Sequence, residues 1–256
     1  GKHLLLQKPL AVELEDGAAI VEAGRNAGRK LAVNQQMRWS AGIVAARQLI
    51  KAGYVGQPTD VQIQVSVKTP WTMWPWLQVS SRLDVLYHSI HYLDAIRSLV
   101  GDPEWVTARH AKYPDQAEVA ETKTVTVLDY ASGLQALIAV NHHNETGGHH
   151  ALFRVLGTEG IVEGTIGLLA EYPAGGVDTA RCRQSDDPVG EWHTIPLKTL
   201  WVPDALIGPM ASLMQAIQTD GVPATDVADN LKTLRLVHAC YRSATEGRSV
   251  RFDEIG

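Results

Sequence analysis

Cysteine is scarce in this sequence. Its 256 residues include two, Cys182 and Cys240. Two cysteines so far apart give neither a disulfide framework nor the close spacing of a metal site, so we expect neither. Such sparing use of cysteine fits a reducing compartment, and we expect a cytoplasmic protein.

Long apolar runs and basic stripes are also missing. No run of about 18 apolar residues occurs, so we expect no membrane span. Basic and acidic residues are interspersed and the formal net charge is -5, whereas a nucleic-acid-binding face needs a basic stripe. The composition, 45% hydrophobic and 20% charged, is ordinary for a globular protein. The length allows one large domain or two small ones.

The first 36 residues predict a strand, a helix and a second strand. Residues 3–6 and 31–34 are short apolar runs, and residues 12–27 between them carry acidic side chains in the first turn and Gly28 after the last. This order predicts a βαβ unit with parallel strands, which binds ligands at the carboxyl ends of its strands. Lys8 lies at one such end, although a lysine there is also commonly a solvated charge. The other end is followed by Gln35, Gln36 and Arg38.

Beyond residue 36 the pattern becomes mostly β. Helices are predicted from Ser40 to Ala52 and near the C-terminus, and alternating segments predict strands and hairpins between them. The predicted strands are 55–68, 122–130, 134–140, 152–156, 160–163 and 168–172, and the last helices are 205–219 and 227–246. We therefore expect an α/β plus α+β fold, in which residues 37–256 form an open, mostly antiparallel sheet that helices face on one side.

Titratable side chains are densest between Asp84 and Asp94. Tyr87, His88 and His91 lie between these two aspartates. Helix positions three and four apart share a face, so helical spacing would bring the two histidines and the carboxylates to one side. Imidazole titrates near neutrality and suits proton transfer. The alternative is a packed helix that happens to carry two histidines.

Three tryptophans, Trp71, Trp74 and Trp76, fall in a loop broken by proline. Three indoles are costly to expose. They either form an apolar wall for a sugar ring or a nicotinamide, or they cap a core.

A second group of histidines includes His142, His143, His149 and His150. Adjacent residues of a strand point to opposite faces, and no cysteine or carboxylate completes a ligand set. We therefore predict no metal site, although some of these histidines can still rim a substrate pocket.

Five short motifs follow one another along the whole chain. They are Gly1 to Ala11 with its Gln7-Lys8-Pro9, Ala41 to Gly56, His91-Tyr92-Leu93-Asp94 with Leu99-Val100-Gly101 after it, Leu156 to Gly160, and a C-terminal stretch from Pro223 to Val250. In this order they resemble the glucose–fructose oxidoreductase / inositol dehydrogenase / MocA (Gfo/Idh/MocA) family of nicotinamide-dependent oxidoreductases. The single motifs are weak, and their shared order is what carries the resemblance.

The resemblance implies hydride transfer between NAD or NADP and a sugar, a polyol or a related hydroxy compound. Residues 1–36 would be the C-terminal remnant of a Rossmann dinucleotide-binding domain, and residues 37–256 a substrate-binding and oligomerisation domain whose last helix packs back on the remnant. The family's glycine-rich phosphate-binding turn is not found. The chain therefore looks like the family fold without roughly its first ~100–120 residues, and we expect impaired cofactor binding by this chain.

The resemblance also implies roles for particular residues. Lys8 and His91 would be catalytic, with Tyr87 at a position where many members carry an aspartate, four residues before the histidine. The implied cofactor contacts are Gln7, Lys8, Pro9, Gln36 and Arg38, and the implied substrate contacts are His88, Trp71, Trp74 and Trp76. Gln7 replaces the family's glutamate, and tyrosine is a weak base at neutral pH.

The implied partners are a small sugar or polyol and further copies of the chain, in a homodimer or higher homo-oligomer formed through the sheet. The alternative function is a non-catalytic relative, a dimeric ligand-binding module. An upstream G-x-G-x-x-G turn would favour the enzyme.

Overall fold

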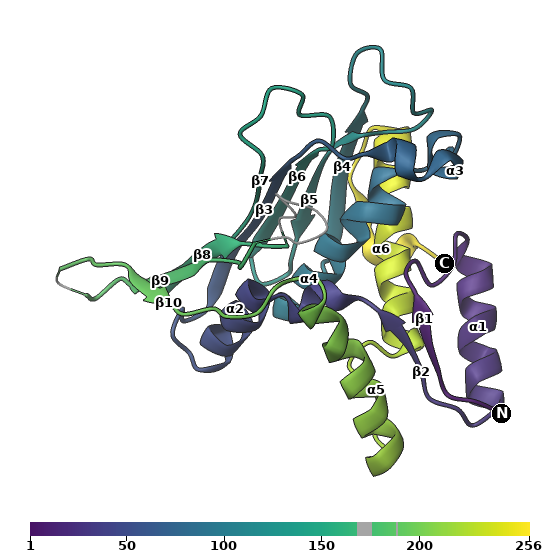
Figure 1. Ribbon diagram of the computed structural model, residues 1–256, viewed down its shortest axis with the longest axis horizontal. Helices are drawn as coiled ribbons and strands as arrows, with labels where there is room; N and C mark the ends of the chain where they lie inside the picture. The colour runs from purple at the N-terminus through teal and green to yellow at the C-terminus, as the bar shows by residue number, and fades with distance from the viewer. Residues whose placement is uncertain (168–175, 188) are drawn as a thin grey trace.

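The computed structural model describes residues 1–167, 176–187 and 189–256. Its N-terminal part is the predicted βαβ unit. Strands β1 (Leu4–Gln7) and β2 (Leu31–Asn34) pair in parallel, and α1 (Leu14–Asn26) connects them (Figure 1). Buried Leu10, Leu31, Val33 and Val227 form the apolar cluster of this unit. The prediction of parallel pairing between the first two strands is confirmed.

The second sheet has nine strands in the part of the chain that the structure describes. Their order is β10-β9-β8-β7-β3-β6-β5-β4-β11, and every neighbouring pair is antiparallel except β3 and β6. The predicted hairpins are β5–β6 and β7–β8, and both are confirmed. The strand predicted at residues 168–172 lies outside the described residues. The strands are β3 (Pro58–Ser66), β4 (Trp105–Ala111), β5 (Lys123–Asp129), β6 (Gln135–Asn141), β7 (His150–Gly157), β8 (Gly160–Thr165), β9 (Ala180–Gln184), β10 (His193–Ile195) and β11 (Val250–Arg251).

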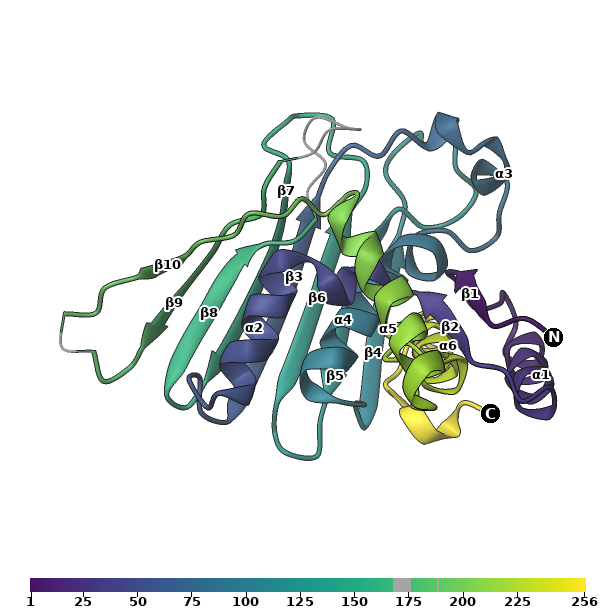
Figure 2. The same cartoon turned by 60° about the horizontal axis from the view of Figure 1, so that its bottom comes forward.

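Helices cover one face of this sheet (Figure 2). They are α2 (Ala41–Lys51), α4 (Ile90–Val100) and α6 (Val227–Glu246), and the main core lies between them and the inward side chains of the strands. Helix α6 also packs on α1 and β2, and so joins the two sheets. Helix α5 (Ile207–Thr219) packs on β2, and α3 (Pro75–Gln78) is a single turn in the tryptophan loop. Within the described ranges, no helix has the length and apolar character that crossing a bilayer requires.

Among the residues that the structure describes, no helix packs on the opposite face of the nine-stranded sheet. This face is hollowed over β3, β7, β8 and β9, where the lining includes Gln62, Gln64, Arg154, Glu163 and Arg181. The outward positions of these four strands are mostly polar, while Leu152 on β7 and Val125 on β5 are exposed apolar side chains of the same face.

The stretch from Asp84 to Asp94 is not one regular helix. Residues Val85–Ser89 form a π-helical turn that runs into α4. Asp84 faces the sheet, where it accepts from Thr124, whereas Asp94 bonds Arg38 in the 3₁₀ turn η1 (Gln36–Trp39). The two carboxylates therefore face different parts of the structure. The prediction that they share one side assumed regular helical spacing, and the wider π turn breaks that spacing.

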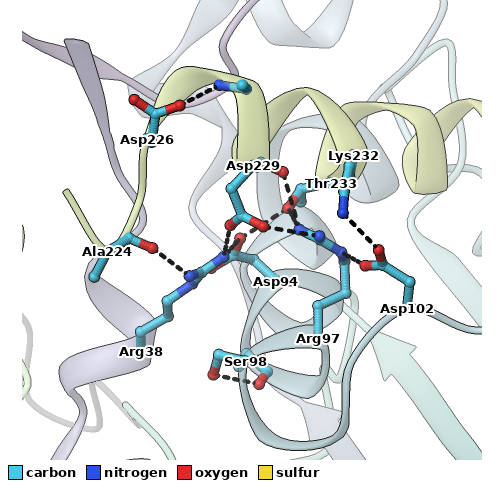
Figure 3. A network of polar contacts seen from close by, with 12 residues as sticks. Arg38, Asp94, Arg97, Ser98, Asp102, Ala224, Asp226, Asp229, Lys232 and Thr233 are labelled. Carbon is cyan, nitrogen blue, oxygen red and sulfur yellow. Dashed lines mark hydrogen bonds and ion pairs between the residues drawn. The ribbon is translucent and has the colours of Figure 1, made fainter. Parts of the chain in front are cut away.

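A buried polar network fixes α4 (Figure 3). Asp94, with no exposed surface, receives Arg38 Nε at 2.6 Å and Nη2 at 2.8 Å, and its Oδ1 also accepts from Thr233 on α6. The guanidinium of Arg38 donates further to Asp229 at 2.7 Å and to the carbonyl of Ala224 at 2.7 Å. Three elements distant in sequence, η1, α4 and α6, thus share one bidentate ion pair.

Replacing Asp94 by alanine should destabilise the fold by about 3–5 kcal/mol, because it leaves a buried guanidinium short of its main partner. Denaturant unfolding followed by circular dichroism measures this. The matched control is Glu22→Ala, which removes the exposed ion pair with Arg25 on α1 and should change little. Equal effects of the two substitutions would contradict the central role given to the buried pair.

Candidate active site

Lys8 follows β1 and its side chain points at the π turn. Its Nζ donates to the backbone carbonyl of Tyr87. Among the described residues, Lys8 forms no ion pair, and burial lowers its pKa to about 8. A cation in a dry site acts strongly on charge that develops beside it.

His91 lies on the first turn of α4 and is buried, with 5% of its surface exposed. Its Nδ1 has no hydrogen-bond partner among the described residues. Burial and the nearby charge of Lys8 hold the pKa of His91 well below its ordinary value. The ring is therefore neutral near pH 7 and has a nitrogen available to accept a proton.

His88 belongs to the π turn and adjoins the same lysine. Burial, and then the charges of His142, Lys8 and His91, lower the pKa of His88 well below its ordinary value. Its ring lies 4.4 Å from that of His142, centroid to centroid, and Trp71 meets its edge at 5.7 Å. The structure thus brings Lys8, His88 and His91 into one polar group behind an indole.

The tryptophans of the loop divide between core and surface. Trp71 is 2% exposed and meets both His88 and His142 edge-on. Trp74 is partly buried and packs against a small apolar cluster of Trp71, Leu77, Leu83 and Ala120. Trp76 is 56% exposed, and the ring of Tyr87 lies 5.2 Å from it. Of the three, Trp71 is the one in ring contact with the histidines, and the roles of Trp74, Trp76 and Tyr87 toward substrate stay predictions.

Several buried amide groups lie at the carboxyl end of β2. Gln35 is fully buried, and neither of its side-chain amide atoms has a partner among the described residues. The same holds for Oδ1 of Asn34 and Oε1 of Gln36. Buried polar atoms are normally paired, so this group has the character of a ligand-binding surface.

The other predicted cofactor contacts are placed differently. Gln7 is exposed and accepts from the backbone N–H of Lys8 at 3.0 Å, while Pro9 continues the turn after β1. The structure gives Arg38 another role from the one predicted. Its Nε and both Nη atoms donate to Asp94, Asp229 and Ala224, so we do not assign it to the cofactor.

Two members of the site were not singled out from the sequence. Asp84 appeared as one of two equivalent carboxylates, and His142 as part of a tract without a metal role. The alternation of strand β6, continued past its end, marks His142 rather than His143 as inward, because Ala136, Ile138 and Val140 are its buried positions. It does not show the partner, Asp84, which comes from a segment distant in sequence.

Comparisons with known proteins agree with this architecture. Residues 43–163 match the model of the GFO/IDH/MocA C-terminal domain. D-apiose dehydrogenase of Paraburkholderia graminis is 28% identical over 100% of this chain and 68% of its own length. 1,5-Anhydro-D-fructose reductase of Ensifer adhaerens is 26% identical over 99% of this chain and 73% of its own. A crystal structure of an oxidoreductase from Agrobacterium radiobacter, in complex with NAD+, L-tartaric acid and magnesium, superposes with a TM-score of 0.86 at 24% identity. It covers 99% of this chain and 74% of that one.

The βαβ unit and the appended, mostly antiparallel sheet give this chain the fold of that solved structure. Residues 43–163 thus resemble the GFO/IDH/MocA C-terminal domain, and the chain is similar over nearly its whole length to D-apiose dehydrogenases.

Lys8 should lose its proton with a midpoint near pH 8. Below this pH the ammonium is present beside His88 and His91, and it is lost as the pH rises through 8. An ordinary exposed lysine titrates near ~10.4. The measurement is an NMR titration of the Nζ and Cε resonances, assigned with Lys8→Met. A midpoint at the ordinary value would show that Lys8 is hydrated rather than buried against the π turn.

Proposed function

We propose that this protein is an NAD- or NADP-dependent oxidoreductase that acts on a sugar, a polyol or a related hydroxy compound. The observation that carries the proposal is the convergence of a desolvated lysine with two neutral histidines at the carboxyl end of β1. Parallel sheets of this class bind ligands at that edge. The named relatives act on small sugars, which supports the substrate class.

The described residues fit the nicotinamide end of a dinucleotide. The unpartnered amides of Asn34, Gln35 and Gln36 offer donors and acceptors where β2 ends, beside Lys8 at the end of β1. Gln7, Pro9 and Gln36 stay proposed contacts to it. When bound, the nicotinamide supplies a hydride acceptor or donor.

The side chains divide the remaining work. The ammonium of Lys8 orients the reacting oxygen and stabilises the negative charge that develops on it. His91, neutral and with a free ring nitrogen, takes the hydroxyl proton in oxidation and returns it in reduction, or acts as the partner of the group that does. Tyr87 or His88 takes the position for which the resemblance to the Gfo/Idh/MocA family implies a carboxylate. Trp71, with Trp74 and Trp76, supplies the apolar wall that a sugar pocket requires.

A non-catalytic ligand-binding module is the second candidate. In its favour, the turn between β1 and α1 in the described chain, residues 8–13, carries no glycine for close approach to phosphate. Turnover by the full-length protein separates the two. We also propose that the protein divides near residue 36 into a dinucleotide-binding part and a substrate domain.

His91→Ala in the full-length protein should lower kcat/KM by about 10²–10⁴-fold, since it removes a general acid/base. Lys8→Ala should be at least as damaging, because it removes both charge and positioning. The assay is dinucleotide absorbance with a panel of sugars and polyols, using NAD and NADP in turn. His149→Ala, on an exposed loop, is the control and should keep full activity. Full turnover in His91→Ala would remove the site assignment and leave the fold untouched.

We propose further that copies of the chain associate through the free face of the nine-stranded sheet, about a two-fold axis. This face carries both charges, for example Arg154 and Glu163, together with partly exposed Leu152 and Val125. Light scattering should give a dimeric or higher mass, and Leu152→Arg combined with Val125→Arg should lower it toward the monomer. A monomeric wild type at working concentration would refute the assembly without touching the chemistry.

A further inference from the structure

A buried carboxylate–imidazole pair lies behind His88. Oδ1 of Asp84 is 2.9 Å from Nε2 of His142, and neither side chain has any exposed surface. Ser89 Oγ donates to Oδ1 of Asp84 at 2.8 Å, and Thr124 Oγ1 donates to Oδ2. The second ring nitrogen of His142 lies 2.7 Å from Thr69 Oγ1. Both oxygens of the carboxylate and both nitrogens of the ring therefore have partners.

The carboxylate of Asp84 keeps its negative charge although the pair is buried. Burial by itself would raise the pKa of Asp84, but His142, Thr124 and Ser89 together lower it below its ordinary value. Asp84 is therefore an anion at neutral pH. Burying such a pair is costly, and well-packed apolar residues could fill the same volume at no greater cost. Its position beside the histidine of the site suggests a role other than stability.

The pair acts on His88 through two contacts. The ring of His142 packs on that of His88 at 4.4 Å, and Trp71 closes the group by touching both rings edge-on. Asp84 also ties the π turn together, because it precedes the turn and accepts from Ser89 at its end. This is the turn whose Tyr87 carbonyl receives Lys8. The place of the His88 ring relative to Lys8 thus depends on Asp84 and His142.

We propose that Asp84 and His142 are positioning residues that fix the ring of His88 beside Lys8, so that His88, rather than Tyr87, is the partner of His91 at the reacting hydroxyl. The inference rests on the proposed function and assigns its proton-handling group more closely. Tyr87 is the less suitable group, because its ring lies against largely exposed Trp76 and it meets Lys8 through its backbone carbonyl.

The test compares full-length variants of the pair with a matched control. His142→Phe keeps an aromatic ring against His88 and Trp71 but cannot bond Asp84 or Thr69. Asp84→Asn removes the charge and keeps the shape. The control is His143→Phe, because His143, the next residue along, also pairs with a carboxylate, Glu118, at 3.0 Å and lies outside the group. The double variant Asp84→Asn/His142→Phe leaves no unpaired buried charge, so it keeps the test open if a single variant unfolds.

Asp84→Asn and His142→Phe should each lower kcat by about ten- to a hundredfold, as do losses of the partners that orient a functional imidazole, with KM and dinucleotide affinity unchanged. His88→Gln removes the imidazole itself and should lower kcat at least as much. The double variant should regain thermal stability and stay as slow as the single ones, because the two residues act as a unit. His143→Phe should keep the wild-type kcat. The ring-nitrogen NMR signals of His88, a readout independent of turnover, should change in His142→Phe and not in His143→Phe.

The outcomes separate the two proposals. An active wild type in which His91→Ala is dead, while His88→Gln and the pair variants keep their kcat and the pair variants keep the His88 signals, overturns this inference alone. So does a loss in Tyr87→Phe that His88→Gln does not share. A wild type with no turnover of any panel substrate with either dinucleotide overturns both.

Discussion

The bidentate contact between Arg38 and Asp94 fixes α4 relative to the segment that leaves β2. Arg38 follows the end of β2, and Asp94 lies one helical turn beyond His91. The contact therefore fixes the histidine of the site relative to the strand ends where a ligand would lie. Its cost in lost hydration is offset by Asp229, Thr233 and the carbonyl of Ala224, which complete the bonding of both charges. A planar guanidinium with a fixed fork suits this task better than an ammonium, because it defines direction as well as distance.

Much of the architecture was predictable from the sequence, because it depends on local periodicity. Apolar runs separated by a helix gave the βαβ unit, and alternation with glycine-containing turns gave the hairpins β5–β6 and β7–β8. Gly28, Gly53 and Gly247 each follow a helix with positive φ, as their positions suggested. The parallel pairing of β3 with β6 was not predictable, since those strands are distant in sequence and no pattern in either selects the partner.

The site was predictable in part, and the missing part has a physical reason. Lys8 and His91 were found because one follows a strand and the other lies in a dense group of titratable residues. The π turn was not predictable, because widening a helix by one residue does not change the apolar periodicity from which helices are predicted. Without the turn, Asp84 and Asp94 looked equivalent. The alternation of β6 marks His142 as inward, but no local pattern shows that it pairs with Asp84, 58 residues away in sequence.

The electrostatics of the site depend on which group each charge is paired with. A lysine near a free carboxylate would form an ion pair, and its charge would already be compensated when substrate binds. In the described part of the chain, the buried carboxylates of Asp84 and Glu121 lie beside the π turn, yet each is engaged elsewhere. Asp84 is saturated by His142, Ser89 and Thr124, and Glu121 accepts from Tyr241 and from the backbone N–H groups of Leu83 and Val85. Lys8 is left with a neutral carbonyl and a pKa lowered by burial. Its strongest available partner is then negative charge that appears on a bound molecule, and this is the condition under which a lysine favours an alkoxide over the alcohol.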